Sequence, residues 1–519
     1  MTDFLYNLGD LNDPALSLDL PAIVDLSHAS GARRYRHAEV RALAGGVAHW
    51  LQARGLPRGA RIAIAASNRA EYLISYFGIM RGGYVAVPIN IKQPRETLAY
   101  VLQDAEIALA FTDGLRRDLL AAHVPVLDFD DAGPQGFEAQ IVAAEFESVR
   151  PGPDEVGQML YTSGSTGKPK GVPLSHAGQL WALRATAAAV ATATGGEQQR
   201  YLLAQPLFHM NGLFMAKRAF AVHAQLVILP GFEVDSYLDA LEQHRITILT
   251  AVPTMFARLI RDPARLQGRD FSALKRVMLG SAPMTLELLQ RLKNAFPGTQ
   301  FSHGYGTTEA GPAIFGPHPD GIPTPGLGLG YPLDPRQVRL VDGADDNQGV
   351  LVMRNPAVLG GYHKLPEKSA QVLKDGWYYS GDVMRRDEQG FFYFVGRADD
   401  MFVCAGENIY PVEVEKLLER HPDVAQASVV PLPDEERAHV PVAFVVRRPG
   451  SDLDAEALKR FALEHGPAYQ HPRRIRFVAE LPWAGTNKVD RNALIDLARE
   501  LEAGHSWHIH QEELQHEPI

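Results

Sequence analysis

Short apolar runs alternate with stretches of helical spacing along much of the chain, and this rhythm constrains the fold more than any other feature. Residues 36–54 carry apolar side chains at helical intervals, and 61–66 (RIAIAA) has the composition of a buried strand. The rhythm returns at 246–252 (ITILTAV) and 276–280 (RVMLG), and a helical stretch that begins after a proline follows each of them. Strands joined by helices pair in parallel, so the sequence predicts two open α/β sheets.

The pattern changes over residues 321–396, where glycine and proline are frequent and short alternating runs predict a small antiparallel β unit. After the charged segment 396–400 (GRADD), strand-like and helical stretches alternate again, which predicts a compact α+β domain. The last residues lack a sustained apolar face and are expected to form a mobile tail. The predicted divisions are a large domain over 1–398, a smaller domain over 399–504 and a polar tail over 505–519.

The charge and cysteine counts exclude several classes of protein. The chain has 51 lysine and arginine residues against 61 aspartate and glutamate residues, a formal net charge of −10. This balance provides no field that would hold nucleic acid or an anionic membrane non-specifically, so any anion must be bound locally. The single cysteine, Cys404, excludes an internal disulfide framework and fits a reducing compartment. With no secretory pattern and no apolar run long enough to span a membrane, we expect a cytoplasmic protein.

The segment 161–176 (YTSGSTGKPKGVPLSH) is the most informative in the chain. Its glycines let backbone N–H groups turn toward an anion, its hydroxyls add donors and its lysines supply positive charge. It is not a Walker A loop, because Pro169 follows Lys168 and the next residues look extended. A flexible surface linker is the alternative, and the closely flanking apolar runs disfavour it. The candidate phosphate-binding residues are Thr162, Ser163, Gly164, Ser165, Thr166, Gly167 and Lys170.

The segment 305–309 (YGTTE) offers a metal ligand. Glu309 is a lone carboxylate among hydroxyls and glycine, suited to hold Mg²⁺ through oxygen, while Thr308 donates to a phosphate. A solvated loop acid is the alternative interpretation of Glu309. The triplet Gly280-Ser281-Ala282 follows a predicted strand, and open α/β sheets bind their ligands at the carboxyl ends of strands.

Two more positions are ambiguous when taken singly. Asp382 can accept hydrogen bonds from two vicinal hydroxyls, although an aspartate after glycine is more often a turn residue. His209 lies in an apolar stretch, where a lone histidine is usually a core residue with satisfied hydrogen bonds.

Several segments together resemble one family, the adenylate-forming superfamily of acyl-CoA and aryl-CoA synthetases, luciferases and peptide-synthetase adenylation domains. The resemblance covers nearly the whole chain and implies an α/β fold: a large N-terminal domain of two αβ sheets plus a small β-barrel, and a smaller mobile α+β C-terminal domain. It also implies a ligase that uses ATP, Mg²⁺ and coenzyme A. The segments, in the family's order, are 161–176, 207–212 (LFHMNG), 305–309, 378–382 (YYSGD), 396–415 (GRADDMFVCAGENIYPVEVE) and 481–491 (LPWAGTNKVDR).

The resemblance implies a role for each matching residue. Tyr305 would stack on adenine beside the triplet at 280–282, and Asp382 and Arg397 would contact the ribose. Glu309 would hold the metal. The remaining residues that it assigns to nucleotide binding are Gly306 and Thr307, and its acyl-pocket residues are His209, Met210, Gly304, Gly306 and Gly311.

Lys488 is the residue expected to act in the first chemical step. A carboxylate that attacks the α-phosphate of ATP brings two anions together, and at 4 Å with an effective dielectric near 20 their repulsion is about 4 kcal/mol. A lysine that bridges both anions offsets a comparable amount. By resemblance, Asp399 is the hinge of the C-terminal domain and the loop at Gly406 lines a tunnel for coenzyme A. Asn487 and Ala405 stand where the family usually has glycine.

The sequence therefore predicts an acyl-CoA or aryl-CoA synthetase acting on an aromatic or medium-to-long apolar acid. Two alternatives stay open: an adenylate-forming enzyme that passes the acyl group to a carrier protein or another acceptor, and a non-catalytic sensor of nucleotide or acyl groups. Glycines at 304, 306 and 311 leave room beside Tyr305, which favours an acid larger than acetate.

Overall fold

The fold was analysed in a computed structural model of the chain. The phosphate-loop candidates Ser163 to Gly167 lie outside the residues that it describes, as do Gly406, Lys488 and the tail except for Trp507. The described residues are 5–162, 168–191, 197–282, 284–405, 407–434, 436–483, 489–504 and 507.

The chain divides into two compact units, which are described separately. The first consists of Met1–Ala282, Arg291–Arg339 and Val352–Ser380, and the second of Pro283–Gln290, Leu340–Leu351 and Gly381–Ile519. The domain boundary between residues 398 and 399 stays a prediction.

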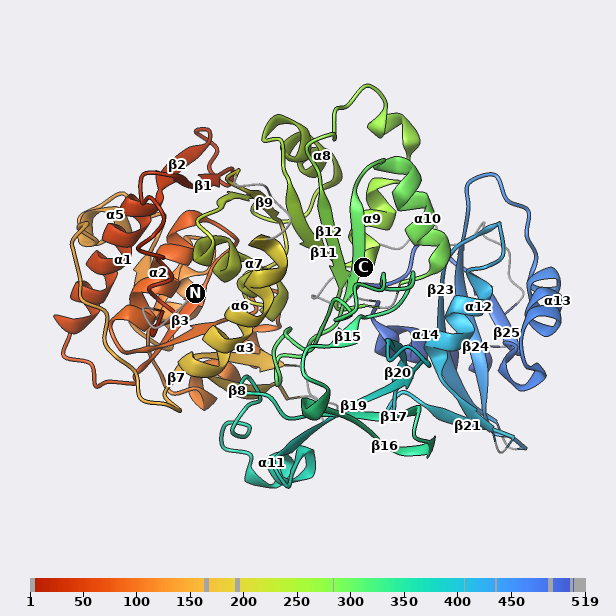
Figure 1. The fold of residues 1–519 in the computed structure, drawn as a ribbon. Helices are drawn as coiled ribbons and strands as arrows, with labels where there is room; N and C mark the ends of the chain where they lie inside the picture. Colours follow the sequence, from red (N-terminus) through yellow and green to blue (C-terminus); the bar gives the residue numbers. More distant parts are fainter. Residues whose placement is uncertain are drawn as a thin grey trace. The chain divides into compact units, whose positions relative to one another are not determined.

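A six-stranded sheet forms the N-terminal part of the first unit, with helices on it (Figure 1). Its strands are β3 (Arg61–Ala65), β4 (Val85–Pro88), β5 (Ile107–Thr112), β6 (Val126–Asp128), β7 (Val156–Thr162) and β8 (Lys170–Ser175), and the helices of this region are α1 (His37–Gln52), α2 (Ala70–Arg81), α3 (Arg95–Asp104), α4 (Arg117–Ala121), α5 (Phe137–Gln140) and α6 (His176–Ala191). The strand order is β6-β5-β3-β4-β7-β8. All neighbouring strands run parallel except β7 and β8, as the alternation of strands and helices predicted.

The close packing of α1 on α2 depends on a small residue. A Cβ atom at Gly78 of α2 would lie 2.5 Å from Cβ of Val47 in α1. Only a residue without a side chain permits this approach, so the two helices can pack directly against each other.

The second sheet of the first unit has seven strands. They are β1 (Pro21–Asp25), β2 (Arg33–Arg36), β9 (Arg200–Leu203), β10 (Gln225–Ile228), β11 (Ile248–Ala251), β12 (Arg276–Gly280) and β13 (Gln300–Gly304), and the helices of this region are α7 (Met210–Ala221), α8 (Val234–Gln243) and α9 (Pro253–Leu259). Helix α10 (Leu286–Ala295) belongs to the second unit up to Gln290 and to the first from Arg291. The order is β13-β12-β11-β9-β10-β1-β2, and only β2 runs antiparallel to its neighbour. The carboxyl ends of β11, β12 and β13 therefore meet at one edge, and the residues that follow them come close together.

The glycine- and proline-rich region forms an antiparallel β unit, as predicted, but not the expected barrel. Its elements are β14 (Phe315–Gly316), β15 (Tyr331–Pro332), β16 (Val338–Asp345), β17 (Gln348–Met353), α11 (Pro366–Val372), β18 (Leu373–Lys374), β19 (Trp377–Arg386) and β20 (Phe392–Arg397). Five strands form one sheet in the order β16-β17-β19-β18, with β20 also paired to β19. Within the described residues this sheet is open, because β16 and the two-residue β18 stay at its ends and do not pair with each other.

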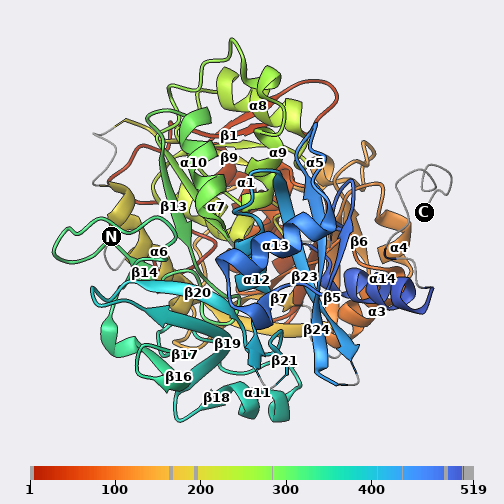
Figure 2. The same cartoon turned by 90° about the vertical axis from the view of Figure 1, so that its right-hand side faces the viewer.

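The C-terminal part of the second unit is the predicted α+β fold. Its elements are β21 (Phe402–Cys404), β22 (Glu407–Ile409), α12 (Pro411–Leu418), β23 (Val424–Asp434), β24 (Ala438–Arg447), α13 (Ala455–His465), β25 (Arg474–Phe477) and α14 (Arg491–Ala503). The sheet order is β22-β21-β24-β23, with β25 parallel to β24. Helices α12 and α13 lie in front of β23 and β24 in Figure 2.

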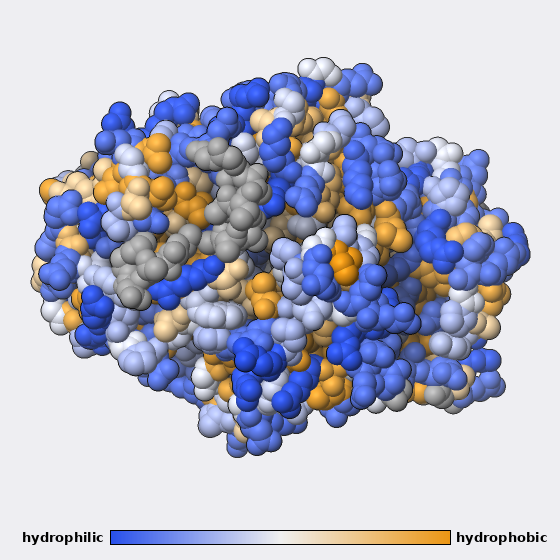
Figure 3. Space-filling model, viewed as in Figure 1, coloured by the Kyte–Doolittle hydropathy of each residue, from blue (hydrophilic) through white to orange (hydrophobic). Residues whose placement is uncertain are grey.

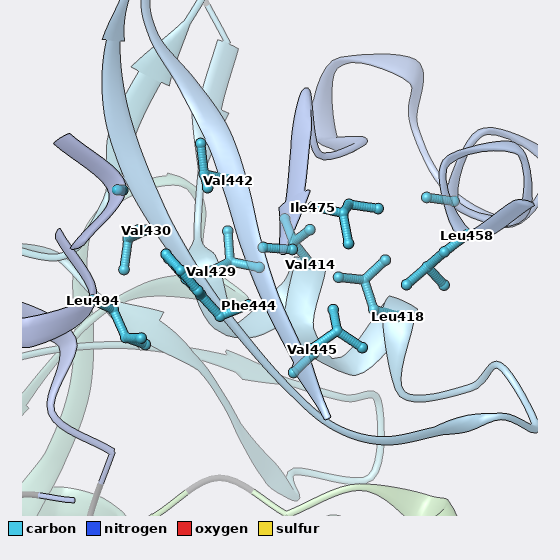
Figure 4. Close-up of a cluster of buried hydrophobic side chains, with 14 of the residues drawn as sticks. Val414, Leu418, Val429, Val430, Val442, Phe444, Val445, Leu458, Ile475 and Leu494 are labelled. Atoms are coloured by element: carbon cyan, nitrogen blue, oxygen red, sulfur yellow. The ribbon is translucent and has the colours of Figure 1, made fainter. Parts of the chain in front are cut away.

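The core of this fold lies on both faces of the β23–β24 pair. Figure 4 shows Leu494 of α14 on one side of the two strands, and Leu418 of α12 with Leu458 of α13 on the other. These three side chains are fully buried, as is Phe444 of β24. Because successive strand residues point to opposite faces, both faces of these strands need apolar residues, which explains the continuous apolar run VAFVV at 442–446.

The surface shows no large apolar area on the face in view. Hydrophilic residues cover most of the face drawn in Figure 3, and hydrophobic residues are scattered between them. Among the described residues, no helix is both long and apolar enough to cross a membrane.

Candidate active site

The phosphate-loop candidates lie between two paired strands. Thr162 ends β7, Lys170 begins β8, and the two residues are partners in the antiparallel ladder. A strand therefore both precedes and follows the candidate residues, whereas a Walker A loop leads from a strand into a helix. The hydroxyl oxygen Oγ1 of Thr162 is buried and has no hydrogen-bond partner among the described residues, which leaves it available to a ligand.

Glu309 and Lys170 meet on the same tyrosine. The hydroxyl of Tyr362 donates a hydrogen bond to Oε1 of Glu309 at 3.1 Å, and Nζ of Lys170 lies 4.5 Å from the centre of the Tyr362 ring. Residues far apart in the sequence thus place a carboxylate at the hydroxyl and an ammonium group over the ring of one buried tyrosine. This arrangement can bind a divalent cation together with the phosphates that it accompanies.

The segment 355–363 holds these groups together by main-chain hydrogen bonds. Leu359 N–H donates to the carbonyl oxygen of Glu309 at 2.7 Å, and the side chain of Asn355 donates to the carbonyl of Ala310 at 3.2 Å. At the other end of the segment, His363 N–H donates to the carbonyl of Gly171 in β8 at 2.9 Å. The segment therefore joins the metal-ligand candidate to the strand that leaves the phosphate loop.

The triplet at 280–282 and Tyr305 follow neighbouring strands, as predicted. Gly280 of β12 and Gly304 of β13 are register partners, and a Cβ atom at Gly280 would lie only 2.9 Å from the carbonyl oxygen of Gly304. Ser281 has a φ of +64°, a left-handed conformation that is uncommon for a residue other than glycine. Such strain is frequent at ligand sites. The Tyr305 ring contacts Phe315, with the ring centres 5.9 Å apart.

The residues after Tyr305 form a tight turn. Thr307 N–H donates to the carbonyl of Gly311 at 3.4 Å, and the Thr307 hydroxyl accepts from Ala310 N–H at 3.0 Å. Gly311 has a φ of +71°, and a Cβ atom at Gly306 would lie 2.7 Å from Cα of Pro312. The two glycines are thus required by the turn itself, which carries the half-buried Thr308 and Glu309 between them.

The predicted acyl-pocket residues begin helix α7. His209 is the N-cap residue with an extended backbone, its ring lies 4.6 Å from that of Phe208, and Met210 is the first helical residue. The next residue, Asn211, donates from Nδ2 to Oγ of Ser281 at 3.3 Å. This bond joins the start of α7 to the triplet that follows β12, so the two predicted parts of the site are neighbours.

The ribose candidates and the hinge candidate form one ion-pair network in the second unit. Asp382 and Arg397 are register partners in β19 and β20, and Nη1 of Arg397 lies 3.0 Å from Oδ1 of the buried Asp382 carboxylate. The same guanidinium donates to both carboxylate oxygens of the exposed Asp399, at 2.8 and 3.1 Å. Burial works against the charged guanidinium, but Asp399 and Asp382 outweigh it and raise the pKa of Arg397.

Gly406 and Lys488 lie outside the described residues, but strand pairing is found on either side of each of them in the sequence. Next to Gly406, Cys404 and Glu407 pair across β21 and β22. Next to Lys488, Trp483 pairs with Val489, and the Asp490 side chain caps α14 by accepting from the N–H of Ala493. A single antiparallel bridge therefore joins the residue before and the residue after the segment that contains Lys488.

Two residues with direct contacts in the site were missed by the sequence analysis. Tyr362 follows two glycines in a region interpreted only as part of a β unit, and no spacing connects it to Glu309. Asn211 stands within the segment 207–212, two residues after His209, so its position in the motif was a usable signal.

A family model for AMP-binding enzymes matches residues 14–363, and the model for the C-terminal domain of AMP-binding enzymes matches residues 413–488. The chain is 31% identical over 472 residues to a feruloyl-CoA synthase from Amycolatopsis sp, covering 88% of this chain and 93% of that protein. It is 29% identical over 493 residues to a long-chain-fatty-acid–CoA ligase from Bacillus subtilis (strain 168), covering 87% of this chain and 88% of that ligase.

Solved structures resemble the chain over almost its whole length. The crystal structure of the anthranilate CoA ligase AuaEII in complex with anthranoyl-AMP matches with a TM-score of 0.86 and 25% identity, covering 97% of this chain and 99% of that one. The match extends over almost the whole chain, which confirms the resemblance seen in the motifs. The chain belongs to the family of AMP-binding enzymes and is an adenylate-forming ligase.

Proposed function

We propose that the protein joins an aromatic carboxylic acid to coenzyme A in two steps. A carboxylate oxygen attacks the α-phosphorus of ATP, and pyrophosphate leaves with the electrons of the broken P–O bond. The sulfur of coenzyme A then attacks the acyl carbon, AMP leaves, and the thiol proton passes to solvent. The observation that carries this proposal is the contact of Glu309 and Lys170 with Tyr362, because Lys170 begins the strand that follows the serine- and threonine-rich segment.

The residues present suit a magnesium ion. The Glu309 side chain is half-buried, Oε1 accepts from Tyr362, and no hydrogen bond to Oε2 is found within the described residues. Mg²⁺ prefers hard oxygen ligands of this kind and usually completes its shell with phosphate oxygens and water. When bound, the ion would neutralise charge on the phosphates of ATP. Thr162 and Lys170 would hold those phosphates, and Thr308 would donate to one of them.

The remaining roles follow the motifs. Asp382 and Arg397 would bind the ribose of the nucleotide, since a buried carboxylate accepts from vicinal hydroxyls. Tyr305 would stack on adenine, His209 and Met210 would border the acyl group, and Lys488 would neutralise the two reacting anions. Asp399 would act as hinge, which its exposed position favours.

An aromatic acid is favoured because a feruloyl-CoA synthase and an anthranilate CoA ligase are among the most similar relatives. The long-chain-fatty-acid–CoA ligase supports a long apolar acid as the second candidate. We place the reaction in the cytoplasm, in keeping with a single, buried cysteine at position 404.

Pyrophosphate release with a panel of benzoates, hydroxycinnamates and fatty acids, each with and without coenzyme A, tests this function. We expect carboxylate-dependent pyrophosphate release and, with coenzyme A, a thioester and AMP. Release of pyrophosphate with transfer only to a carrier protein or an amine would identify another acceptor. No release with any acid would favour a sensor.

Replacing Tyr362 with phenylalanine should raise the Mg²⁺ concentration that gives half-maximal pyrophosphate release about tenfold. The variant keeps the ring against Lys170 but removes the hydroxyl that orients Glu309, and a hydrogen bond to a charged group contributes about 1.5–3 kcal/mol. Tyr379→Phe is the matched control, because Tyr379 contacts Lys374 instead. If the Mg²⁺ dependence is unchanged in Tyr362→Phe, the assignment of Glu309 as the metal ligand oriented by Tyr362 is wrong.

A further inference from the structure

A chain of hydrogen bonds with a fixed direction runs from Gln205 through Thr250 and Asn211 to Ser281. Nε2 of Gln205 donates to the carbonyl oxygen of Thr250, and also lies 3.3 Å from Oγ1 of the same residue. The Thr250 hydroxyl donates to Oδ1 of Asn211 at 2.8 Å, and Nδ2 of Asn211 donates to Ser281 at 3.3 Å. Gln205 and Thr250 are buried, with 4% and 7% of their surface exposed.

The direction of this chain follows from the donors and acceptors available. A carbonyl oxygen can only accept, so the Gln205 amide must turn its NH₂ group, not its oxygen, toward Thr250. The Thr250 hydroxyl receives one of these protons and has a single proton of its own, which it gives to Asn211 Oδ1. The Asn211 amide is thereby held with its NH₂ group directed to the other side, toward Ser281.

The NH₂ group of Asn211 can donate more hydrogen bonds than the described residues accept. It carries two N–H groups, and within the described residues its only acceptor is Ser281, which is exposed. Asn211 itself is half-buried, in the first turn of α7 after His209. An N–H group that is held in place without a full set of acceptors is suited to recognise an acceptor on a ligand.

We propose that Asn211 is a specificity-determining residue, and that its amide N–H donates to an oxygen on the acyl part of the substrate. This proposal rests on the proposed function above. The preferred acid would then be an aromatic acid with a hydroxyl, methoxy or carbonyl oxygen away from the reacting carboxylate. An unsubstituted acid would leave the N–H without an acceptor in the closed site, and sites built to hydrogen-bond a substrate reject analogues that lack the bonding group.

The test compares matched acids, such as a hydroxycinnamate and cinnamate, by kcat/KM for pyrophosphate release. We expect the wild type to prefer the oxygen-bearing acid by about ten- to a hundred-fold. Asn211→Leu, of similar size but without the donor, should lose most of this preference, so that the ratio of kcat/KM between the two acids approaches one. Thr250→Val should have a smaller effect in the same direction, because the Asn211 amide is then free to rotate.

The ratio of kcat/KM between the two acids distinguishes recognition of the substrate by Asn211 from a purely structural role. If Asn211 only joined α7 to the triplet at 280–282, the variants would lose activity toward both acids equally, and the proposal would be wrong. Equal kcat/KM for both acids in the wild type would overturn this proposal and leave the proposed function intact. No pyrophosphate release with any acid would overturn both. Asn294→Leu, an exposed change on α10, is the control and should behave like the wild type.

Discussion

Replacing Lys488 with alanine should slow formation of the acyl-adenylate by a factor of about 10² to 10³. The attacking carboxylate and the α-phosphate are both negative, and their repulsion at 4 Å is about 4 kcal/mol for an effective dielectric near 20. A lysine placed between them removes most of this cost in the transition state. The second step does not use ATP and does not bring a carboxylate against the α-phosphate. Thioester formation from supplied acyl-adenylate should therefore survive in the variant.

The measurement follows each half-reaction separately, as pyrophosphate release and as thioester formation from synthetic acyl-adenylate. Lys459→Ala is a suitable control, because Lys459 lies on α13 of the same unit and its ammonium pairs with the nearby surface residue Glu456 at 2.9 Å. Such surface pairs contribute little. Equal loss of both half-reactions in Lys488→Ala would show that the lysine supports the fold or the nucleotide site in general, and the assignment would be wrong.

Replacing Lys217 with methionine should raise the free energy of unfolding at pH 6 by about 2 to 4 kcal/mol. Lys217 lies on α7 with no exposed surface, and its ammonium donates to Oε1 of Gln179 at 2.8 Å and of Gln158 at 3.2 Å. Neither partner is charged, so burial is uncompensated and lowers the pKa of Lys217 to about 7. Methionine fills a similar volume without a charge, although the two amide oxygens lose a donor.

The pH dependence distinguishes this explanation from simple repacking. Between pH 7 and about 10 the unfolded chain binds the Lys217 proton and the folded chain does not, so wild-type stability should rise with pH by up to about 1.4 kcal/mol per unit. Below pH 7 both states are protonated and the penalty is complete. The advantage of Lys217→Met should therefore shrink as pH rises, measured by urea unfolding at pH 6 to 9. Parallel curves for the variant, as expected for the exposed control Lys275→Met, would contradict the prediction.

The alternating runs of the first part were sufficient to predict most of its elements. The helical stretch at 36–54 is α1, RIAIAA is β3 and RVMLG is β12, each within a few residues of the expected bounds. Periodicity reports which face of an element is buried, and this information is local. The predicted barrel was wrong for the described residues. Closure of a barrel depends on whether the edge strands pair, and the local sequence of β16 and β18 does not indicate whether they pair with each other.

The site was predictable to the extent that its residues stand in motifs. Gly280, Tyr305 and Glu309 could be chosen from the sequence, since they follow strands or stand in a family segment. Their partners could not, because the contact between Tyr362 and Glu309 joins residues 53 positions apart. Lys217 was not noticed either, because an ordinary lysine within a helical stretch gives no indication that two distant glutamines face it.

By itself, the sequence determined the family, the order of strands and helices, and the chemical groups offered to a nucleotide and a metal, because motifs and periodicity are properties of neighbouring residues. Only the tertiary structure decided which of those groups touch. The orientation of the Asn211 amide by Thr250 depends on how parallel strands align their carboxyl ends. The meeting of Lys170 and Glu309 on one tyrosine depends on the segment 355–363, which is hydrogen-bonded to both parts of the chain. Hydrogen bonds between distant residues are directional and short, so their geometry is set only when the whole domain packs.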